Sequence, residues 1–266
     1  MDDRSAAIDL DRADAYGLAF ADVYDRWYHH VTDAEATASF VAARTCGGPA
    51  LELGVGSGRL ARPLAGRGVP VVGVDGSAEM LDRCRVTQAE ESTSGSNRGP
   101  AIPGGSLHLI RADMRALPLR GPFGSALIAF NTLFNLGTEA EQKQLLADLA
   151  VLIGPDGSIV VEAIDVTALL DGPTRSLGVR DTTDDGVVLT ATQLDRDRQV
   201  VNGQHIEVDH RGVRLRPWRL RWLTPTQLDH LADRAGLRLA ERYGSWDSAP
   251  YTSSSDTLVS VYHRQR

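Results

Sequence analysis

Residues 51–58, LELGVGSG, and residues 71–75, VVGVD, contain the pattern that decides the fold of this chain. The pattern predicts a buried strand, a glycine loop, a helix and a second strand that ends in the carboxylate of Asp75. Three glycines at alternate positions let a ligand approach the backbone where a Cβ atom would collide with it. A carboxylate at the end of the second strand can accept hydrogen bonds from both hydroxyls of a ribose. The unit therefore predicts a site for an adenosine-containing ligand.

The spacing of the glycines bears on which ligand this is. The dinucleotide fingerprint is G-x-G-x-x-G, which suits a pyrophosphate at a helix N-terminus. Here the run is G-x-G-x-G, and Arg59 stands at the position of the third fingerprint glycine. The spacing to Asp75 suits either ligand. The loop thus disfavours a nicotinamide cofactor, and a nicotinamide-dependent oxidoreductase remains an alternative.

The loop resembles motif I of the class I S-adenosylmethionine-dependent methyltransferases, which is written acidic-x-G-x-G-x-G. The matching residues are Glu52, Gly54, Gly56 and Gly58. The resemblance implies S-adenosyl-L-methionine as the cofactor. Its amino-acid end carries a carboxylate and an ammonium, which backbone N–H groups and either Glu52 or a nearby carbonyl can receive.

The resemblance continues along the chain. Asp113 and Met114 are similar to the family's adenine site after the third strand, where the aspartate accepts from the exocyclic amine. The alternative is that Asp113 only caps a turn. Phe130, at the end of the fourth strand, is expected to border the sulfonium, whose charge favours an aromatic neighbour. The other cofactor-binding residues implied by the family pattern are Gly76, Met80 and Ala112.

An aromatic stripe on the helix expected at residues 13–30 also resembles a known group. Tyr28, with Tyr24 as the second candidate, is similar to the tyrosine that closes over the cofactor in the aminosugar N-methyltransferases of antibiotic biosynthesis. A stripe with this spacing is equally typical of core packing. We expect Tyr28 and Asn131 to be the catalytic residues, although Asn131 could instead satisfy only backbone groups.

The order of the predicted elements indicates an α/β fold. Buried strands are expected at residues 50–53, 70–75, 106–110, 125–130 and 158–164. Helices are expected at residues 33–45, 58–67, 78–88 and 139–152, a turn at 154–157, and a flexible insertion at 91–105. Alternating strands and helices predict a Rossmann-like parallel sheet with helices on both faces. A helix at 225–236 and strands at 237–243 and 256–263 resemble the usual ending of class I methyltransferases.

The pattern changes after the fifth strand. Residues 186–222 alternate apolar and polar side chains, which predicts three or four antiparallel strands with a hairpin turn at Asn202-Gly203. We expect an inserted lid over the acceptor pocket. The expected divisions are 1–165 for the N-terminal helices and cofactor-binding core, 166–223 for the lid, and 224–266 for the closing helix and strands. His205, Glu207 and Asp209 share one face of a lid strand, which suggests a base, a metal cluster or simply a solvated face; we expect no metal.

The bulk composition limits the partners. The chain has 266 residues and a formal net charge of −7, which argues against nucleic acid as the main partner, although five arginines cluster between residues 211 and 221. No apolar run approaches the roughly 20 residues that span a bilayer, and the N-terminus lacks a signal pattern. We therefore expect a cytoplasmic protein without a membrane partner; the oligomeric state stays open.

These features predict transfer of a methyl group from S-adenosylmethionine to N or O of a small molecule, such as a natural-product intermediate. The sulfonium is already activated, so much of the catalysis can come from aligning the reacting atoms. A hydroxyl acceptor needs a positioned base, and the sequence contains no evident base constellation. A non-catalytic protein that binds S-adenosylmethionine is the further alternative.

Overall fold

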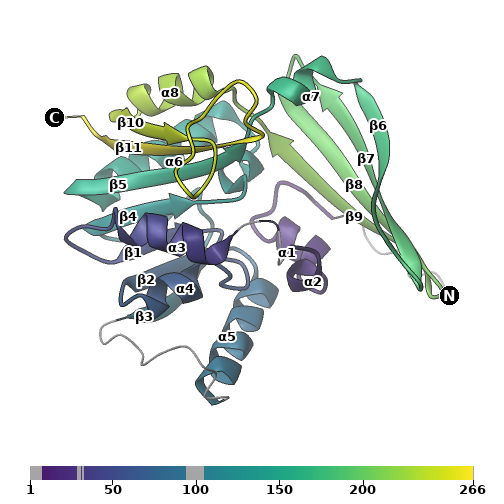
Figure 1. Cartoon of the computed structure of the whole chain (residues 1–266), viewed down its shortest axis with the longest axis horizontal. Helices are drawn as coiled ribbons and strands as arrows, with labels where there is room; N and C mark the ends of the chain where they lie inside the picture. Colours follow the sequence, from purple (N-terminus) through teal and green to yellow (C-terminus); the bar gives the residue numbers. More distant parts are fainter. Residues whose placement is uncertain (1–7, 29–30, 32, 94–104, 266) are drawn as a thin grey trace.

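The computed structural model describes residues 8–28, 31, 33–93 and 105–265. It contains a seven-stranded sheet and a separate four-stranded antiparallel sheet, with two short helices between them (Figure 1). The insertion expected at residues 91–105 lies mostly outside the described residues. No helix in the described part of the chain is long and apolar enough to cross a membrane.

The main sheet is parallel except at one edge. In spatial order its strands are β10 (Leu237–Tyr243), β11 (Thr257–Arg264), β5 (Ile153–Ile164), β4 (Phe123–Ile128), β1 (Ala50–Leu53), β2 (Pro70–Asp75) and β3 (Ser106–Arg111). β11 runs antiparallel to both β5 and β10. The predicted Rossmann-like sheet and its closing pair are therefore confirmed. The strand order changes direction between β1 and β4, and ligands of such sheets bind outside the carboxyl ends of the strands at this point.

Helices cover both faces of the main sheet (Figure 1). α6 (Glu139–Leu152) and α8 (Pro225–Arg234) pack with Leu51 and Leu53 in one core. On the other face lie α3 (Ala34–Ala42), α4 (Ala61–Gly66) and α5 (Ala78–Thr93). Capping boxes begin α6 at Thr138 and α8 at Thr224, and Asp33 caps the N-terminus of α3. Local sequence chemistry thus sets the starts of these helices.

The prediction of a single helix at residues 13–30 is wrong. The structure has α1 (Ala15–Phe20) and α2 (Tyr24–Tyr28) instead. The Ala19 carbonyl accepts a hydrogen bond of 2.7 Å from the buried Arg216 guanidinium, and Val23 N–H donates to the Phe20 carbonyl. Because a continuous helix needs Val23 N–H to reach Ala19 O, the arginine interrupts the α-helical pattern.

The turn expected at residues 154–157 lies inside β5, near its start, where a Cβ atom on Gly157 would be only 3.2 Å from Gly154 N. The register with β4 shifts from Phe123 opposite Ile153 to Ser125 opposite Ser158. The extra residues are accommodated as an irregularity in the strand, in the manner of a β-bulge. Gly and Pro here mark a tight local turn within the strand pair.

The second sheet follows β5 and the short helix α7 (Thr167–Asp171). Its strands, in spatial order, are β6 (Arg175–Thr183), β7 (Gly186–Asp195), β8 (Val200–Asp209) and β9 (Gly212–Arg221). The predicted antiparallel insertion is confirmed, but Asn202-Gly203 lies inside β8 and is not a turn. A Cβ atom on Gly203 would be 1.9 Å from Trp218 Cε2, so this glycine makes room for a ring from β9.

Candidate active site

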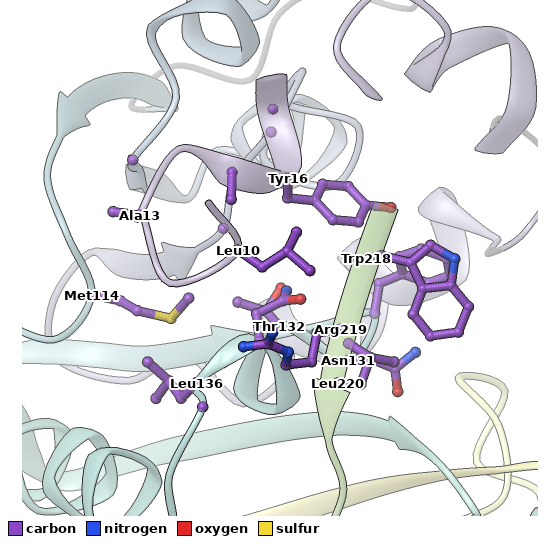
Figure 2. Close-up of a pocket in the computed structure, with 18 of the residues that line it drawn as sticks. Leu10, Ala13, Tyr16, Met114, Asn131, Thr132, Leu136, Trp218, Arg219 and Leu220 are labelled. Carbon is purple, nitrogen blue, oxygen red and sulfur yellow. The ribbon is translucent and has the colours of Figure 1, made fainter. Parts of the chain in front are cut away.

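A cavity of about 890 Å³ extends from the carboxyl ends of the parallel strands to the four-stranded sheet. The N-terminal segment forms one of its walls. Figure 2 shows Leu10, Ala13 and Tyr16 on one side, Met114 and Leu136 on the other, and Trp218 at its edge. The strand ends, the N-terminal segment and the second sheet thus line one continuous space.

The structure brings together nearly all the site residues predicted from the sequence. Those that line the cavity are Tyr24, Tyr28, Glu52, Gly54, Gly56, Asp75, Gly76, Met80, Ala112, Asp113, Met114, Phe130 and Asn131. Gly58 is the exception. A Cβ atom there would be 2.3 Å from the Cys84 sulfur on α5, so this glycine permits packing of the loop against a helix.

The glycine loop and Asp75 form one hydrogen-bonded unit. Gly54, Gly56 and Gly58 have φ angles of 68°, 55° and 79°, which favour glycine. Asp75 Oδ2 accepts from Gly56 N at 2.9 Å, and Oδ1 accepts from Ser77 N at 2.8 Å. Each carboxylate oxygen can accept a further hydrogen bond. Asp75 therefore shapes the loop and still has acceptor capacity toward the cavity.

Glu52 is a buried carboxyl group beside this loop. It is 3% exposed, and its Oε2 atom has no hydrogen-bond partner among the described residues. Burial raises the pKa of Glu52 to about 8; Asp75 adds to the rise, and Arg59 opposes it. A buried oxygen without a partner is costly. The site thus fits the ammonium of the amino-acid end of S-adenosylmethionine.

The chain after β4 is held in an unusual conformation. Phe130 and Asn131 have φ angles of 51° and 63°, in the left-handed region that costs most for bulky residues. Glu162 Oε2 accepts from Phe130 N at 2.8 Å, and Glu162 Oε1 accepts from Trp246 Nε1 at 3.0 Å. Asn131 Oδ1 accepts from Ile164 N at 2.8 Å. The end of β5 therefore orients both residues that follow β4.

Sequence reasoning missed Glu162 and Trp246 as parts of this site. The available signals were a carboxylate near the end of the fifth strand and the Gly244-Ser245-Trp246 segment near the C-terminus. Asn131 does satisfy a backbone group, as its alternative interpretation had it, and it also lines the cavity.

Four aromatic rings surround the region between the glycine loop and the second sheet. The ring centroids are 5.0 Å apart for Tyr24 and Tyr28, 5.4 Å for Tyr28 and Phe130, and 6.2 Å for Tyr16 and Tyr24. Burial raises the pKa of Tyr16 and of Tyr24, so both hydroxyls stay protonated at neutral pH. Tyr16 was assigned only to a packing stripe in the sequence, yet it lines the cavity.

Asp113 makes the local contacts of a turn cap. Its Oδ1 accepts from Arg115 N at 2.9 Å, and its carboxylate forms an ion pair of 2.7 Å with the Arg115 guanidinium. It lines the cavity as well. The cap and a contact with a ligand are compatible, because the carboxylate has further lone pairs.

The face of β8 that carries His205 is not solvated, contrary to one of the interpretations. His205 is 5% exposed, with its ring centroid 5.7 Å from those of both Phe20 and Trp27. Its Nδ1 atom lies 2.8 Å from Thr190 Oγ1. Burial, followed by Arg180 and Arg216, lowers the pKa of His205 to about 4, so the imidazole is neutral at pH 7.

The neighbours of His205 on β8 have separate partners. Glu207 forms ion pairs with Arg216 at 2.8 Å and with Arg26 at 2.9 Å, whereas Asp209 pairs with Arg211. These three side chains therefore do not converge on one point. The arginine cluster is also paired with carboxylates of the same chain. Arg211 pairs with Asp209, Arg214 with Asp22, and Arg216 with both Asp22 and Glu207. Arg219 pairs with Asp11 and Arg221 with Glu139.

Comparison with known proteins agrees with this geometry. Residues 50–157 match a family described as a methyltransferase domain. The CcbJ methyltransferase from Streptomyces caelestis is 34% identical, with a TM-score of 0.86 over 96% of this chain and 99% of that one. The chain belongs to the S-adenosylmethionine-dependent methyltransferases. S-adenosyl-L-methionine is its cofactor, and this membership replaces the oxidoreductase alternative.

Two further relatives of this methyltransferase are more distant. The cypemycin N-terminal methyltransferase from Streptomyces sp is 26% identical over 220 residues, which are 81% of this chain and 82% of that protein. CalS10, an amino pentose methyltransferase from Micromonospora echinaspora solved with S-adenosylmethionine bound, is 22% identical and has a TM-score of 0.63 over 91% of this chain and 97% of that one. The similarity to CalS10 shows a shared fold only.

Proposed function

We propose that this methyltransferase methylates a nitrogen or oxygen atom of a small molecule, such as a natural-product intermediate. The observation that carries the proposal is the continuous cavity between the glycine loop and the four-stranded sheet. Two relatives are an amino pentose methyltransferase and a cypemycin N-terminal methyltransferase. The pairing of the arginines at 211–221 with carboxylates of the same chain also favours a small acceptor over a polyanion.

The predicted residues take these roles in the proposal. Backbone N–H groups of the loop and Glu52 hold the methionine end, and Asp75 accepts from the ribose hydroxyls. Gly76 and Met80 lie beside the nucleoside. Ala112, Asp113 and Met114 surround the adenine, with the carboxylate as acceptor for its amine. Phe130 borders the sulfonium, Tyr24 and Tyr28 close over it, and Asn131 orients the acceptor.

Residues 166–223 form the acceptor lid in this proposal. When bound, S-adenosylmethionine supplies an activated methyl group, and the protein has to align the acceptor with it and exclude water. The aromatic rings of Tyr16, Tyr28 and Phe130 do the second task. An amine acceptor has to be unprotonated, and its excess proton leaves after the new bond has formed; a neutral imidazole such as His205 can hold it by a hydrogen bond.

Two measurements test the proposal. Calorimetric titration should detect binding of S-adenosylmethionine and none of NADH. Incubation with methyl-labelled S-adenosylmethionine, small-molecule extracts and total RNA should place the label in the small-molecule fraction. Label in RNA would contradict the acceptor class, and cofactor binding without transfer to any acceptor would favour the non-catalytic alternative.

A further inference from the structure

Arg180 on β6 is an unusual cation in the cavity wall. Its guanidinium lies over the rings of Tyr28 and Trp27, with centroid distances of 4.9 Å and 5.6 Å. One N–H group reaches the Trp27 carbonyl at 3.5 Å, the long limit of a hydrogen bond. Because ring contacts use the flat face of a guanidinium, most of its in-plane N–H groups are left for another partner.

Four of the other five arginines that line the cavity form ion pairs with carboxylates, and the fifth, Arg59, lies over the Phe130 ring at 5.8 Å and acts electrostatically on the buried Glu52. Ion pairs join Arg12 to Asp14 at 2.8 Å, Arg115 to Asp113 at 2.7 Å, Arg198 to Asp195 at 3.9 Å and Arg219 to Asp11 at 3.1 Å. Within the described ranges, no ion pair joins Arg180 to a carboxylate. The contrast is informative, because Asp and Glu outnumber Lys and Arg by 35 to 28 in this chain.

Arg180 also acts on its surroundings. It contributes to the lowered pKa of His205, together with burial and Arg216. The groups packed around that imidazole are Thr190 on β7, Arg216 and Trp218 on β9, and the rings of Phe20 and Trp27. An anion beside Arg180 would offset its charge and raise the pKa of His205.

We infer that Arg180 anchors an anionic group, a carboxylate or a phosphate, on the methyl acceptor. The inference rests on the proposed function, since it needs an acceptor in this cavity. A guanidinium matches both anions through paired N–H···O bonds, and it is already held in place by two rings. Contact with Tyr28, a residue placed at the cofactor, sets the anion near the acceptor side of the cavity.

Matched probes test the anchor on the whole protein saturated with S-adenosylhomocysteine. The probes are 4-aminobenzoate, 4-aminophenyl phosphate and the neutral 4-aminobenzamide, titrated by calorimetry. At least one anion should bind about tenfold more tightly than the amide, and the stronger of the two identifies the anion. Arg180→Gln should reduce this preference to less than about twofold, whereas Arg238→Gln, an exposed arginine on β10, should retain it.

A second readout follows the imidazole by NMR. The preferred anionic probe should raise the pKa of His205 in the wild-type protein and in Arg238→Gln, and leave it unchanged in Arg180→Gln. A wild-type protein that does not distinguish acid from amide, whether it binds both or neither, contradicts the inference. So does a preference that survives Arg180→Gln. Loss of S-adenosylmethionine binding or of methyl transfer would instead contradict the proposed function.

Discussion

At the scale of single residues, Asp75 and Glu52 show how one kind of side chain takes two roles. Asp75 accepts two backbone N–H groups and shapes the loop. Glu52 has an oxygen that is buried without a partner among the described residues. The first carboxylate is organised by the chain itself, whereas in the proposed function the second receives its partner from the cofactor.

Replacing Asp75 by asparagine should weaken cofactor binding. The amide can accept from only one of the two backbone N–H groups and presents an NH₂ group where an acceptor is needed. We expect a loss of roughly 1–3 kcal/mol in the binding free energy of S-adenosylmethionine, measured by calorimetry. The control is Asp82→Asn, an exposed residue on α5 that pairs with Arg85, which should leave affinity unchanged. Unaltered affinity in Asp75→Asn would place the ribose elsewhere.

Cofactor binding should release a proton from Glu52 near pH 7. The carboxyl is largely protonated there because its pKa is about 8, and the ammonium of the cofactor favours its ionised form. Affinity should therefore rise as pH increases from about 6 to 7.5. Calorimetry in buffers with different ionisation enthalpies measures the released proton, and Glu52→Gln should release none.

The raised pKa of Glu52 also determines whether the cofactor-free protein gains or loses stability as pH rises. The native state holds this proton over the range between an ordinary glutamate pKa, about 4.3, and about 8, while the unfolded state has lost it. The contribution of Glu52 to the free energy of unfolding is therefore full at low pH and falls as pH rises through this window. Glu52→Gln should lose less stability than the wild type between pH 5.5 and 8.5 in chemical denaturation; an identical pH dependence would contradict this assignment.

At the scale of elements, the end of β5 supports the end of β4. Two successive non-glycine residues in the left-handed region cost on the order of 1–3 kcal/mol each. Glu162 and the Ile164 amide stabilise them through hydrogen bonds. The indole N–H of Trp246 reaches the second Glu162 oxygen, so the segment after β10 takes part in the same support.

Glu162→Gln should disturb this support without removing the side chain. A glutamine has one acceptor oxygen for two buried N–H donors, so either Phe130 N or Trp246 Nε1 loses its partner. We expect a destabilisation of about 1–3 kcal/mol by chemical denaturation, with a fall in kcat larger than the change in cofactor affinity. The control is Glu241→Gln, a carboxylate 41% exposed in its pair with Arg44, which should cost below about 1 kcal/mol. Equal effects of the two variants would deny Glu162 its positioning role.

Gly203→Ala should act on the lid through Trp218. The added methyl would be 1.9 Å from the ring, so the indole has to move out of its place against β8. We expect a raised KM for the acceptor with little change in cofactor affinity, accompanied by a shift in tryptophan fluorescence. Gly178→Ala on β6 is the matched control, because nothing lies within 4 Å of its added methyl. A Gly203→Ala protein with normal acceptor kinetics would show that this ring is not part of the acceptor pocket.

At the scale of the whole molecule, the second sheet and the N-terminal helices are joined by a network of charges. Arg216 is 2% exposed and binds the Ala19 carbonyl, Asp22 and Glu207. Arg26 on α2 binds the other carboxylate oxygen of Glu207. The second sheet and the helices that carry the cavity tyrosines are therefore expected to move together.

Arg216→Met should uncouple the second sheet from the N-terminal helices α1 and α2. Removing the guanidinium leaves the partly buried carboxylate of Glu207 and the Ala19 carbonyl without their main partner. We expect destabilisation toward the lower end of about 3–5 kcal/mol, because Asp22 is half exposed. Hydrogen exchange should show faster opening of α1 and α2. Arg214→Met removes only an exposed partner of Asp22 and should cost below about 1 kcal/mol, so similar losses in both variants would contradict the network.

The sequence by itself determined the parallel sheet, the glycine loop with Asp75, the capped helix starts and the presence of an antiparallel insertion. These features depend on residues close together in the chain, through side-chain periodicity, backbone conformation and local hydrogen bonds. The same locality explains why nearly all the predicted cofactor residues meet in one cavity: the carboxyl ends of parallel strands share one edge of the sheet.

Only the tertiary structure decided the rest. Arg216 interrupts a helix from 197 positions away, Trp218 explains a glycine that looked like a turn, and Trp246 meets Glu162 across 84 positions. Arg180 has no local signal at all, since its character comes from two rings on another element and from the lack of a carboxylate partner in the described chain. Such contacts form only when distant segments pack, and burial then sets the charge state and conformation of each group.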